Sequence, residues 1–206
     1  MELTAHEIAE TVDGVVVAGD PLARASSFAI DSRALQHGAC FVAITAKRDG
    51  HDFIGDAFAG GATIALVSRS IDAEVPPAGS STGGAIVHAA DPIRALGQLG
   101  MLARARLRGA AVVGITGSSG KTGTKDLTAA ALAPKFQVHV SPGSYNNEIG
   151  VPLTLLDAPE TSEAVVLEMG ARAVGNVEYL CAIARPTVGV ITNVGLAHAG
   201  PLGGPA

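Results

Sequence analysis

Residues 111–126, AVVGITGSSGKTGTKD, determine how the surrounding part of the chain folds. The stretch begins with an apolar run rich in β-branched residues, passes through small residues at 116–120, and reaches Lys121 and Thr122 at the start of a segment that can be helical. A strand that ends in a glycine turn and leads into a helix gathers backbone N–H groups, an ammonium group and a hydroxyl around one point. The stretch therefore predicts a binding site for a polyphosphate.

The residue types of this loop fit that chemistry. Gly117 and Gly120 allow the backbone to wrap an anion and to adopt positive φ. Lys121 supplies a compact positive charge, and the hydroxyl of Thr122 can ligate a Mg²⁺ ion that accompanies the phosphates. The common pattern G-x-x-x-x-G-K-[ST] requires glycine where this chain has Ile115. A glycine-rich strand-to-helix turn without a ligand is therefore the alternative interpretation.

Composition limits the class of protein. The chain has 206 residues, of which 48% are hydrophobic and 3% aromatic. We therefore expect a core of Ala, Val, Leu and Ile, typical of α/β proteins, in one large domain or two small ones. The net charge of −5 and the absence of a basic run argue against a nucleic-acid partner.

The cysteines and the N-terminal stretch indicate a cellular compartment. Cys40 and Cys181 lie far apart, in apolar stretches and without metal-ligand spacing, which predicts two buried thiols in a reducing environment. The polar and acidic N-terminal stretch does not have the composition of a signal peptide, and no apolar run approaches the ~18 residues of a membrane span. We therefore expect a soluble cytoplasmic protein without membrane insertion.

Strands and helices alternate regularly after Gly109. We predict strands at 111–116, 137–140, 164–168 and 187–192, and helices at 121–133, 149–156 and 174–184. Such alternation predicts a parallel sheet with right-handed crossovers, in which ligands gather at the carboxyl ends of the strands. We place a domain boundary near residue 109.

The helix that precedes this boundary carries a series of arginines. It is expected to begin at Asp91-Pro92, and Arg94, Arg104, Arg106 and Arg108 fall on its outward face. Such a series could bind phosphate, but a solvated helix face is the more common outcome. We expect the solvated face.

Polar residues follow the later strands of the predicted sheet. Glu168 ends an apolar strand beside the glycine loop, where it is either a Mg²⁺ ligand or a charged side chain emerging into water. Asn146 and Asn147 lie in a turn, where asparagines often serve the backbone instead of a ligand. His198 follows the last strand and is open to a structural or a functional interpretation.

Several ordered segments resemble a known family. They are GITGSSGKTGTKD (114–126), SPGSYNNEIGVPLTLL (141–156), VVLEMGA (165–171) and VGVITNVGLAH (188–198), together with FAIDSRALQHGACFVAI (28–44) and DGHDFIGDAFAGGATIALV (49–67). The sequence resembles the ATP-dependent Mur ligases of peptidoglycan synthesis from about residue 3 to about residue 200. The loop pattern of that family, G-x-x-G-x-x-G-K-T, accounts for Ile115.

The resemblance implies a fold and an activity. The fold is α/β, with a small domain for the UDP-muramoyl substrate at 1–108 and the first part of a P-loop, parallel-sheet ATP-binding domain at 109–206. The implied reaction joins D-alanyl-D-alanine to UDP-N-acetylmuramoyl-tripeptide through an acyl phosphate, with ATP and Mg²⁺, in a monomer. We expect a truncated ligase that lacks the C-terminal domain and is inactive by itself.

Alternatives to this activity stay open. One is a ligase of the same family that adds a single amino acid. Another is a non-catalytic module that binds UDP-muramoyl-peptide or ATP. An unrelated P-loop phosphotransferase is more remote, because it leaves the segments at 28–44 and 49–67 unexplained.

The family's motifs also imply roles for individual residues. The residues implied to bind the nucleotide are Gly117, Ser118, Ser119, Gly120, Lys121, Thr122 and Gly123. Those implied to contact the UDP-muramoyl substrate are Ser32, Arg33, Asn146 and Asn147. Magnesium would be held by Thr122, Glu168 and His198, and the catalytic residues would be Lys121, Asn147 and His198.

Overall fold

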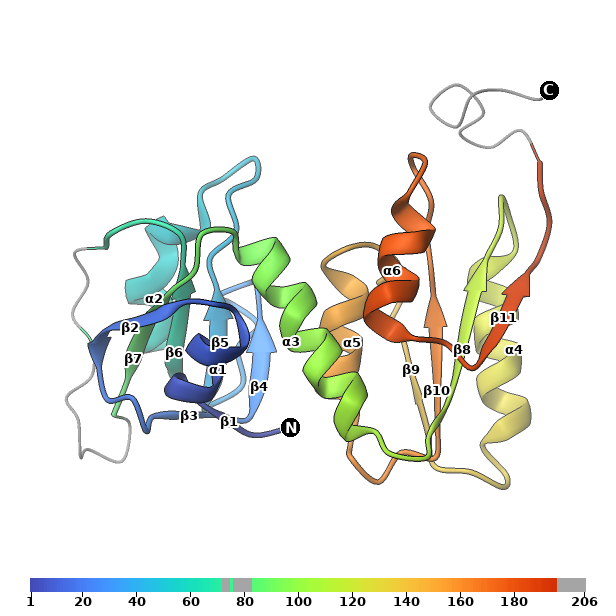
Figure 1. Ribbon diagram of the computed structural model, residues 1–206, viewed down its shortest axis with the longest axis horizontal. Helices are drawn as coiled ribbons and strands as arrows, with labels where there is room; N and C mark the ends of the chain where they lie inside the picture. Colours follow the sequence, from blue (N-terminus) through green and yellow to red (C-terminus); the bar gives the residue numbers. More distant parts are fainter. Residues whose placement is uncertain (72–74, 76–82, 196–206) are drawn as a thin grey trace. The chain divides into compact units, whose positions relative to one another are not determined.

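The computed structural model describes residues 1–71, 75 and 83–195 (Figure 1). The chain divides into an N-terminal unit, Met1–Leu99, and a C-terminal unit, Gly100–Ala206. The division falls within helix α3 (Pro92–Arg106), whereas the sequence places a domain boundary near residue 109. The boundary and the roles assigned to the two parts stay predictions.

The N-terminal unit is built on a five-stranded sheet of order β2-β7-β6-β5-β4. Its strands are β2 (Val15–Gly19), β4 (Ser27–Ala29), β5 (Ala39–Val42), β6 (Ala62–Val67) and β7 (Ala85–His88). The unit also contains β1 (Leu3–Thr4), α1 (Ala5–Thr11), β3 (Arg24–Ala25), η1 (Gly50–Phe53) and α2 (Ile54–Ala59). Neighbouring strands from β4 to β7 are parallel and β2 is antiparallel, so the carboxyl ends of four strands meet at one edge.

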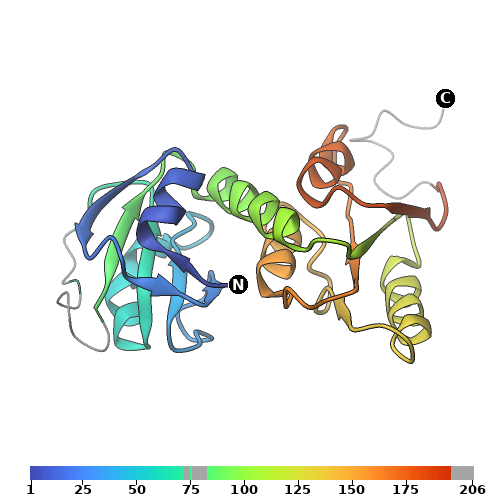
Figure 2. The same ribbon diagram turned by 60° about the horizontal axis from the view of Figure 1, so that its bottom comes forward.

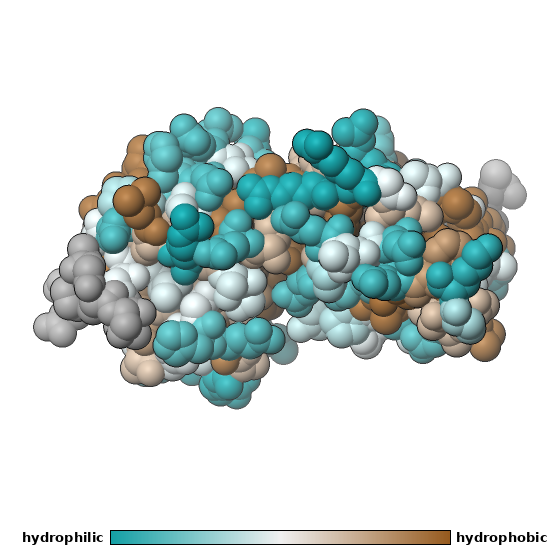
Figure 3. All heavy atoms as spheres, turned by 90° about the horizontal axis from the view of Figure 1, so that it is seen from below, coloured by the Kyte–Doolittle hydropathy of each residue, from teal (hydrophilic) through white to brown (hydrophobic). Residues whose placement is uncertain are grey.

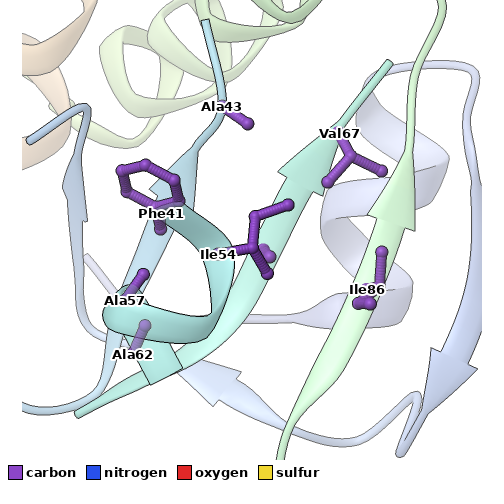
Figure 4. Packing of buried hydrophobic residues seen from close by; sticks show 8 residues of the cluster. Phe41, Ala43, Ile54, Ala57, Ala62, Val67 and Ile86 are labelled. Carbon is purple, nitrogen blue, oxygen red and sulfur yellow. The ribbon is translucent and has the colours of Figure 1, made fainter. Parts of the chain in front are cut away.

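Aliphatic residues form most of the core of this unit, as the composition predicts. Helix α2 packs on β5 and β6, and its Ile54 is 1% exposed beside Phe41, Val67 and Ile86 (Figure 4). Alanine at 57 lies close to the strands and lets the helix approach them. The core therefore needs few aromatic side chains.

The C-terminal unit contains a four-stranded sheet of order β11-β8-β10-β9, in which all neighbours are parallel. Its strands are β8 (Ala111–Thr116), β9 (Val138–Val140), β10 (Ala164–Glu168) and β11 (Val188–Ile191), and its helices are α4 (Lys121–Leu132), α5 (Gly150–Asp157) and α6 (Asn176–Ala184). Helix α4 covers one face of the sheet, and α5 and α6 lie on the other (Figures 1 and 2). The predicted alternation and parallel α/β fold are confirmed.

One of the arginines expected to be solvated has a structural role instead. Nε of Arg104 donates a hydrogen bond to the carbonyl oxygen of Ala184 at 2.9 Å, and the guanidinium group also donates to the carbonyl oxygens of Arg185 and Leu107 at 3.4 and 3.3 Å. Carbonyl groups at the end of a helix have no partner within the helix. Arg104 therefore caps the carboxyl end of α6, and the prediction of a solvated side chain is wrong for this residue.

The two cysteines differ in exposure. Both are free thiols; Cys40 is buried in β5 and Cys181 is partly exposed on α6. Burial raises the pKa of the Cys40 thiol. The prediction of two buried thiols is thus correct for Cys40 and wrong for Cys181.

One face of the molecule is mixed in character. On the face drawn in Figure 3, hydrophobic side chains are interspersed among hydrophilic ones. Within the described residues, no helix combines the length and the apolar character that crossing a membrane requires.

Candidate functional site

The loop between β8 and α4 adopts the backbone conformation that its glycines permit. Gly117 has φ +136° and Gly120 has φ +80°, both in the region that favours glycine. Gly120 is the N-cap of α4 and has no side chain to cap the helix. The first N–H groups of a helix have no partner within the helix, so they are available to an anion.

Residues that follow β11 hold this loop in place. The side-chain oxygen of Asn193 accepts a hydrogen bond from the Ser119 N–H at 2.9 Å, and its amide donates to the Ser119 hydroxyl at 2.9 Å. The Thr192 hydroxyl donates to the carbonyl oxygen of Ser119 at 2.6 Å, and the Ser118 hydroxyl accepts from the Gly195 N–H at 2.9 Å. The serines expected to bind a nucleotide thus also anchor the loop. No role was predicted for Asn193 from the sequence, although its position directly after a predicted strand marks it as a candidate for the site.

Lys121 stays close to its own loop. Its Nζ donates to the carbonyl oxygen of Gly117 at 2.8 Å, and the residue is partly exposed. The ammonium group therefore lies beside the N-terminus of α4. There a phosphate group can replace the carbonyl oxygen of Gly117 as its hydrogen-bond acceptor. Gly123, two positions further, is exposed, and a Cβ built on it meets no atom within 4 Å.

Glu168 lies at the carboxyl end of β10 and is 2% exposed, so its side chain does not emerge into water. Its Oε2 accepts a hydrogen bond from the hydroxyl of Thr122 at 2.7 Å, and its Oε1 accepts from the side-chain amide of Asn146 at 2.7 Å. Both donors are neutral, and among the described residues no cationic side chain pairs with this carboxylate. Burying an ionised carboxylate without a paired cation costs free energy, and a bound cation would offset that cost.

The oxygen atoms around Glu168 fit a magnesium ion. Mg²⁺ commonly takes one or two carboxylates and completes its coordination with phosphate oxygens and water. Glu168 and Thr122 supply a carboxylate and a hydroxyl oxygen 2.7 Å apart. In the described part of the chain no three His, Cys, Asp or Glu side chains gather into a metal cluster. A cation here would therefore depend on phosphate and water for its other ligands.

The two asparagines of the turn have different roles. The carbonyl oxygen of Asn146 accepts from the Gly170 N–H at 2.7 Å, and a Cβ on Gly170 would lie 3.0 Å from Oδ1 of Asn146. The absence of a side chain at Gly170 thus gives the carboxamide of Asn146 room to reach Glu168. Oδ1 of Asn147 instead accepts from the Gly150 N–H at 2.9 Å, at the first residue of α5. Asn146 contacts the carboxylate, whereas Asn147 organises the backbone.

The residues expected to contact the UDP-muramoyl substrate follow strand β4 in the N-terminal unit. Nε and Nη2 of Arg33 donate to the Asp31 carboxylate at 2.9 and 2.6 Å, which holds the pKa of Asp31 well below its usual range. The Arg33 side chain is 81% exposed, so its remaining N–H donors face solvent. Ser32, which lies between these two residues in the sequence, is partly buried. His198, expected to ligate magnesium, lies outside the described residues.

A buried histidine was missed as a structural element of this unit. Nδ1 of His51 lies 2.6 Å from Oδ1 of Asp49, and Nε2 accepts a hydrogen bond from the Ser68 N–H at 3.0 Å. The acceptor role of Nε2 requires the neutral tautomer with the proton on Nδ1. His51 thus joins the loops that follow β5 and β6. Its hydrogen bond to Asp49 is the main cause that lowers the pKa of that carboxyl group.

Replacing Glu168 by glutamine is expected to raise the free energy of unfolding by about 1 kcal/mol in the absence of metal, because the amide removes an unpaired buried charge. A carboxamide can still bond both Thr122 and Asn146. Urea denaturation followed by circular dichroism measures the change. The control is Glu160→Gln, which removes the same charge at an exposed position outside the helices and is expected to change nothing. A Glu168→Gln variant less stable than the unchanged protein would contradict this account of the carboxylate.

Comparisons with known proteins show the family to which the chain is related. Residues 115–204 match the Mur ligase middle domain. The chain is 41% identical over 98% of its length to the UDP-N-acetylmuramoyl-tripeptide–D-alanyl-D-alanine ligase of Mycobacterium bovis, and it covers 43% of that protein. The ligase of the same name from Bacillus subtilis is 41% identical over 85% of the chain, which covers 37% of that relative.

Solved structures give the same result. A crystal structure of MurF from Acinetobacter baumannii superposes with a TM-score of 0.86 at 33% identity, over 99% of this chain and 43% of the other. The structure of MurF from Thermotoga maritima in complex with ADP superposes with a TM-score of 0.68 at 37% identity, over 84% of this chain and 38% of the other.

The chain belongs to the Mur ligase family. Within that family it is similar to ligases of the MurF type, and it spans 43% of the length of the M. bovis relative.

Proposed function

We propose that this chain is the part of a MurF-type ligase that binds UDP-N-acetylmuramoyl-tripeptide and ATP, and that the whole protein joins D-alanyl-D-alanine to the tripeptide. One observation carries the proposal. Lys121 and the Thr122–Glu168–Asn146 hydrogen-bonded group meet at one edge of a parallel sheet, in a chain 41% identical to ligases of that name. We propose a cytoplasmic monomer that binds no nucleic acid.

The nucleotide would bind at the amino end of α4. Lys121 and the loop at 117–123 would hold the β- and γ-phosphates. Thr122 and Glu168 would hold Mg²⁺, which neutralises charge on the phosphates when it is bound, and His198 would serve a second ion. The ammonium group of Lys121 would lie beside the γ-phosphate and offset the negative charge on its oxygens during transfer.

The proposed reaction needs no protein nucleophile. The terminal carboxylate of the tripeptide attacks the γ-phosphorus of ATP, which gives an acyl phosphate and ADP. The amine of D-alanyl-D-alanine then attacks the acyl carbon and loses a proton to water. The bond from that carbon to the bridging oxygen breaks, and phosphate leaves with this oxygen. The chain contributes by placing the reacting groups and balancing their charge, with Asn146 and Asn147 near the acyl group. The UDP-muramoyl part would contact Ser32 and Arg33 in the domain proposed at 1–108.

Calorimetric titration of the 206-residue chain tests this proposal. We expect UDP-N-acetylmuramoyl-tripeptide to bind about tenfold more tightly than its dipeptide precursor, a difference of about 1.4 kcal/mol. Arg33→Ala should weaken tripeptide binding about tenfold, since an exposed guanidinium group suits anionic substrate groups.

The matched control is Arg94→Ala, which removes another exposed arginine of the N-terminal unit and should leave the affinity unchanged. Equal affinity for the two peptides would contradict the tripeptide specificity and favour a ligase that adds a single amino acid. Binding of neither peptide would contradict the role of the N-terminal unit.

A further inference from the structure

We propose that Lys125 is a positioning residue whose buried ammonium group fixes the loop that carries Asn146, and through Asn146 the carboxylate of Glu168. The consequence for magnesium and nucleotide rests on the proposed function, but the contacts do not. Lys125 lies on α4, four residues after Lys121, and is 3% exposed. Lysine is almost never buried unless its charge is paired.

The ammonium group of Lys125 contacts three protein oxygens. Its Nζ donates to the carbonyl oxygen of Ser141 at 2.9 Å and to that of Gly143 at 3.0 Å. A third oxygen, Oδ1 of Asp126, lies 3.1 Å away on a side chain that is 64% exposed. Two of the three N–H donors of the ammonium group thus bond backbone carbonyl oxygens, and the charge is paired with a carboxylate. Its role is therefore distinct from that of Lys121.

The segment held by Lys125 also binds the strand that carries Glu168. Ser141 is 1% exposed; its N–H donates to the carbonyl oxygen of Val166 at 3.0 Å, and its hydroxyl accepts from the Glu168 N–H at 3.3 Å. Residues 141–143 are thus clamped between α4 and β10. Three residues beyond Gly143, the side chain of Asn146 reaches Glu168. A shift of the clamped segment is transmitted directly to that side chain.

Both hydrogen-bond donors of the Glu168 carboxylate are therefore attached to one helix. Thr122 lies on α4 itself, and Lys125 holds to α4 the segment at 141–143 that leads to Asn146. Helix α4 begins at the glycine loop, residues 117–120, so the position of the Glu168 carboxylate is set relative to that loop. Without the ammonium group the Thr122 contact would remain, but the Asn146 contact would keep only the support of the Gly170 N–H. The carbonyl groups of residues 141 and 143 would also lose a donor, which favours a rearranged loop.

Hydrogen exchange measured by NMR on the ligand-free chain tests the positioning directly. In Lys125→Met, which keeps the length and removes the donors, we expect the Gly170 amide, a donor to the Asn146 carbonyl oxygen, to exchange at least about tenfold faster. The Asn146 side-chain amide resonances should shift, while the Val113 amide in the sheet changes less than about threefold. A uniform increase over all amides, or an unchanged Gly170, would overturn the proposal.

Two further variants complete this experiment. Lys135→Met makes the same replacement at an exposed position of the C-terminal unit and should leave all of these amides unchanged. Lys125→Gln retains one N–H-bearing group, so we expect an increase at Gly170 of only about threefold. If the methionine variant does not fold, the glutamine variant provides the same test.

The affinity for ADP separates this inference from the proposed function. Lys125→Met should weaken binding of ADP about tenfold in the presence of Mg²⁺ and less than twofold without it, since only the metal ligand is displaced. An equal loss in both conditions would show an effect on the whole phosphate loop and overturn the inference. If the unchanged chain binds no ADP, the proposed function fails, and hydrogen exchange alone decides the role of Lys125.

Discussion

Replacing Lys121 by methionine is expected to weaken the binding of ADP at least about a hundredfold, or about 2.7 kcal/mol, while leaving the fold intact. The ammonium group is the compact charge at the amino end of α4, and within the protein it bonds a carbonyl oxygen of its own loop at 2.8 Å. Its loss therefore removes an interaction with phosphate without leaving a buried group unpaired. Calorimetric titration with Mg²⁺ and ADP measures the affinity, and thermal unfolding checks the fold.

The control for this variant is Lys135→Met, which lowers the net charge equally at an exposed site. It should bind ADP as the unchanged chain does. A Lys121→Met chain that keeps its affinity within about threefold would contradict the assignment of Lys121 to phosphate, because charge-assisted bonds to phosphate are among the strongest.

Replacing Gly117 by alanine is expected to lower the free energy of unfolding of the C-terminal unit by about 3 kcal/mol. The residue has φ +136°, and an added Cβ would lie 2.1 Å from Oγ1 of Thr192 and 3.0 Å from the backbone nitrogen of Asn193. The Thr192 hydroxyl cannot simply turn away, because its one hydrogen is donated to the carbonyl oxygen of Ser119 at 2.6 Å, with that of Thr116 at 3.2 Å. Urea denaturation measures the loss.

The matched glycine is Gly123, in the first turn of α4. A Cβ there meets nothing within 4 Å, so Gly123→Ala should stabilise the helix by about 0.5 to 1 kcal/mol. If Gly117→Ala costs less than about 1 kcal/mol, the loop adapts to a side chain and the strain argument is wrong.

Local patterns in the sequence were sufficient for the architecture of the C-terminal unit. Periodicity and glycine position are properties of neighbouring residues, so the strands, the helices and their parallel arrangement could be predicted. The rule that ligands gather at the carboxyl ends of parallel strands also selected Lys121, Thr122, Asn146 and Glu168, which the structure brings together. Their roles toward a nucleotide stay predictions.

The sequence by itself thus determined the α/β fold, the glycine loop and the candidate residues at the strand ends. Only the tertiary structure decided which polar groups are buried and what they contact. In the sequence, Lys125 is one more polar residue of a predicted helix, yet it is buried against carbonyl groups 16 and 18 residues away. Arg104 is predicted from the sequence to be solvated, yet it caps a helix that ends 80 residues later. Such partners depend on chain segments meeting in space, because burial makes every polar group require a partner that no local pattern specifies.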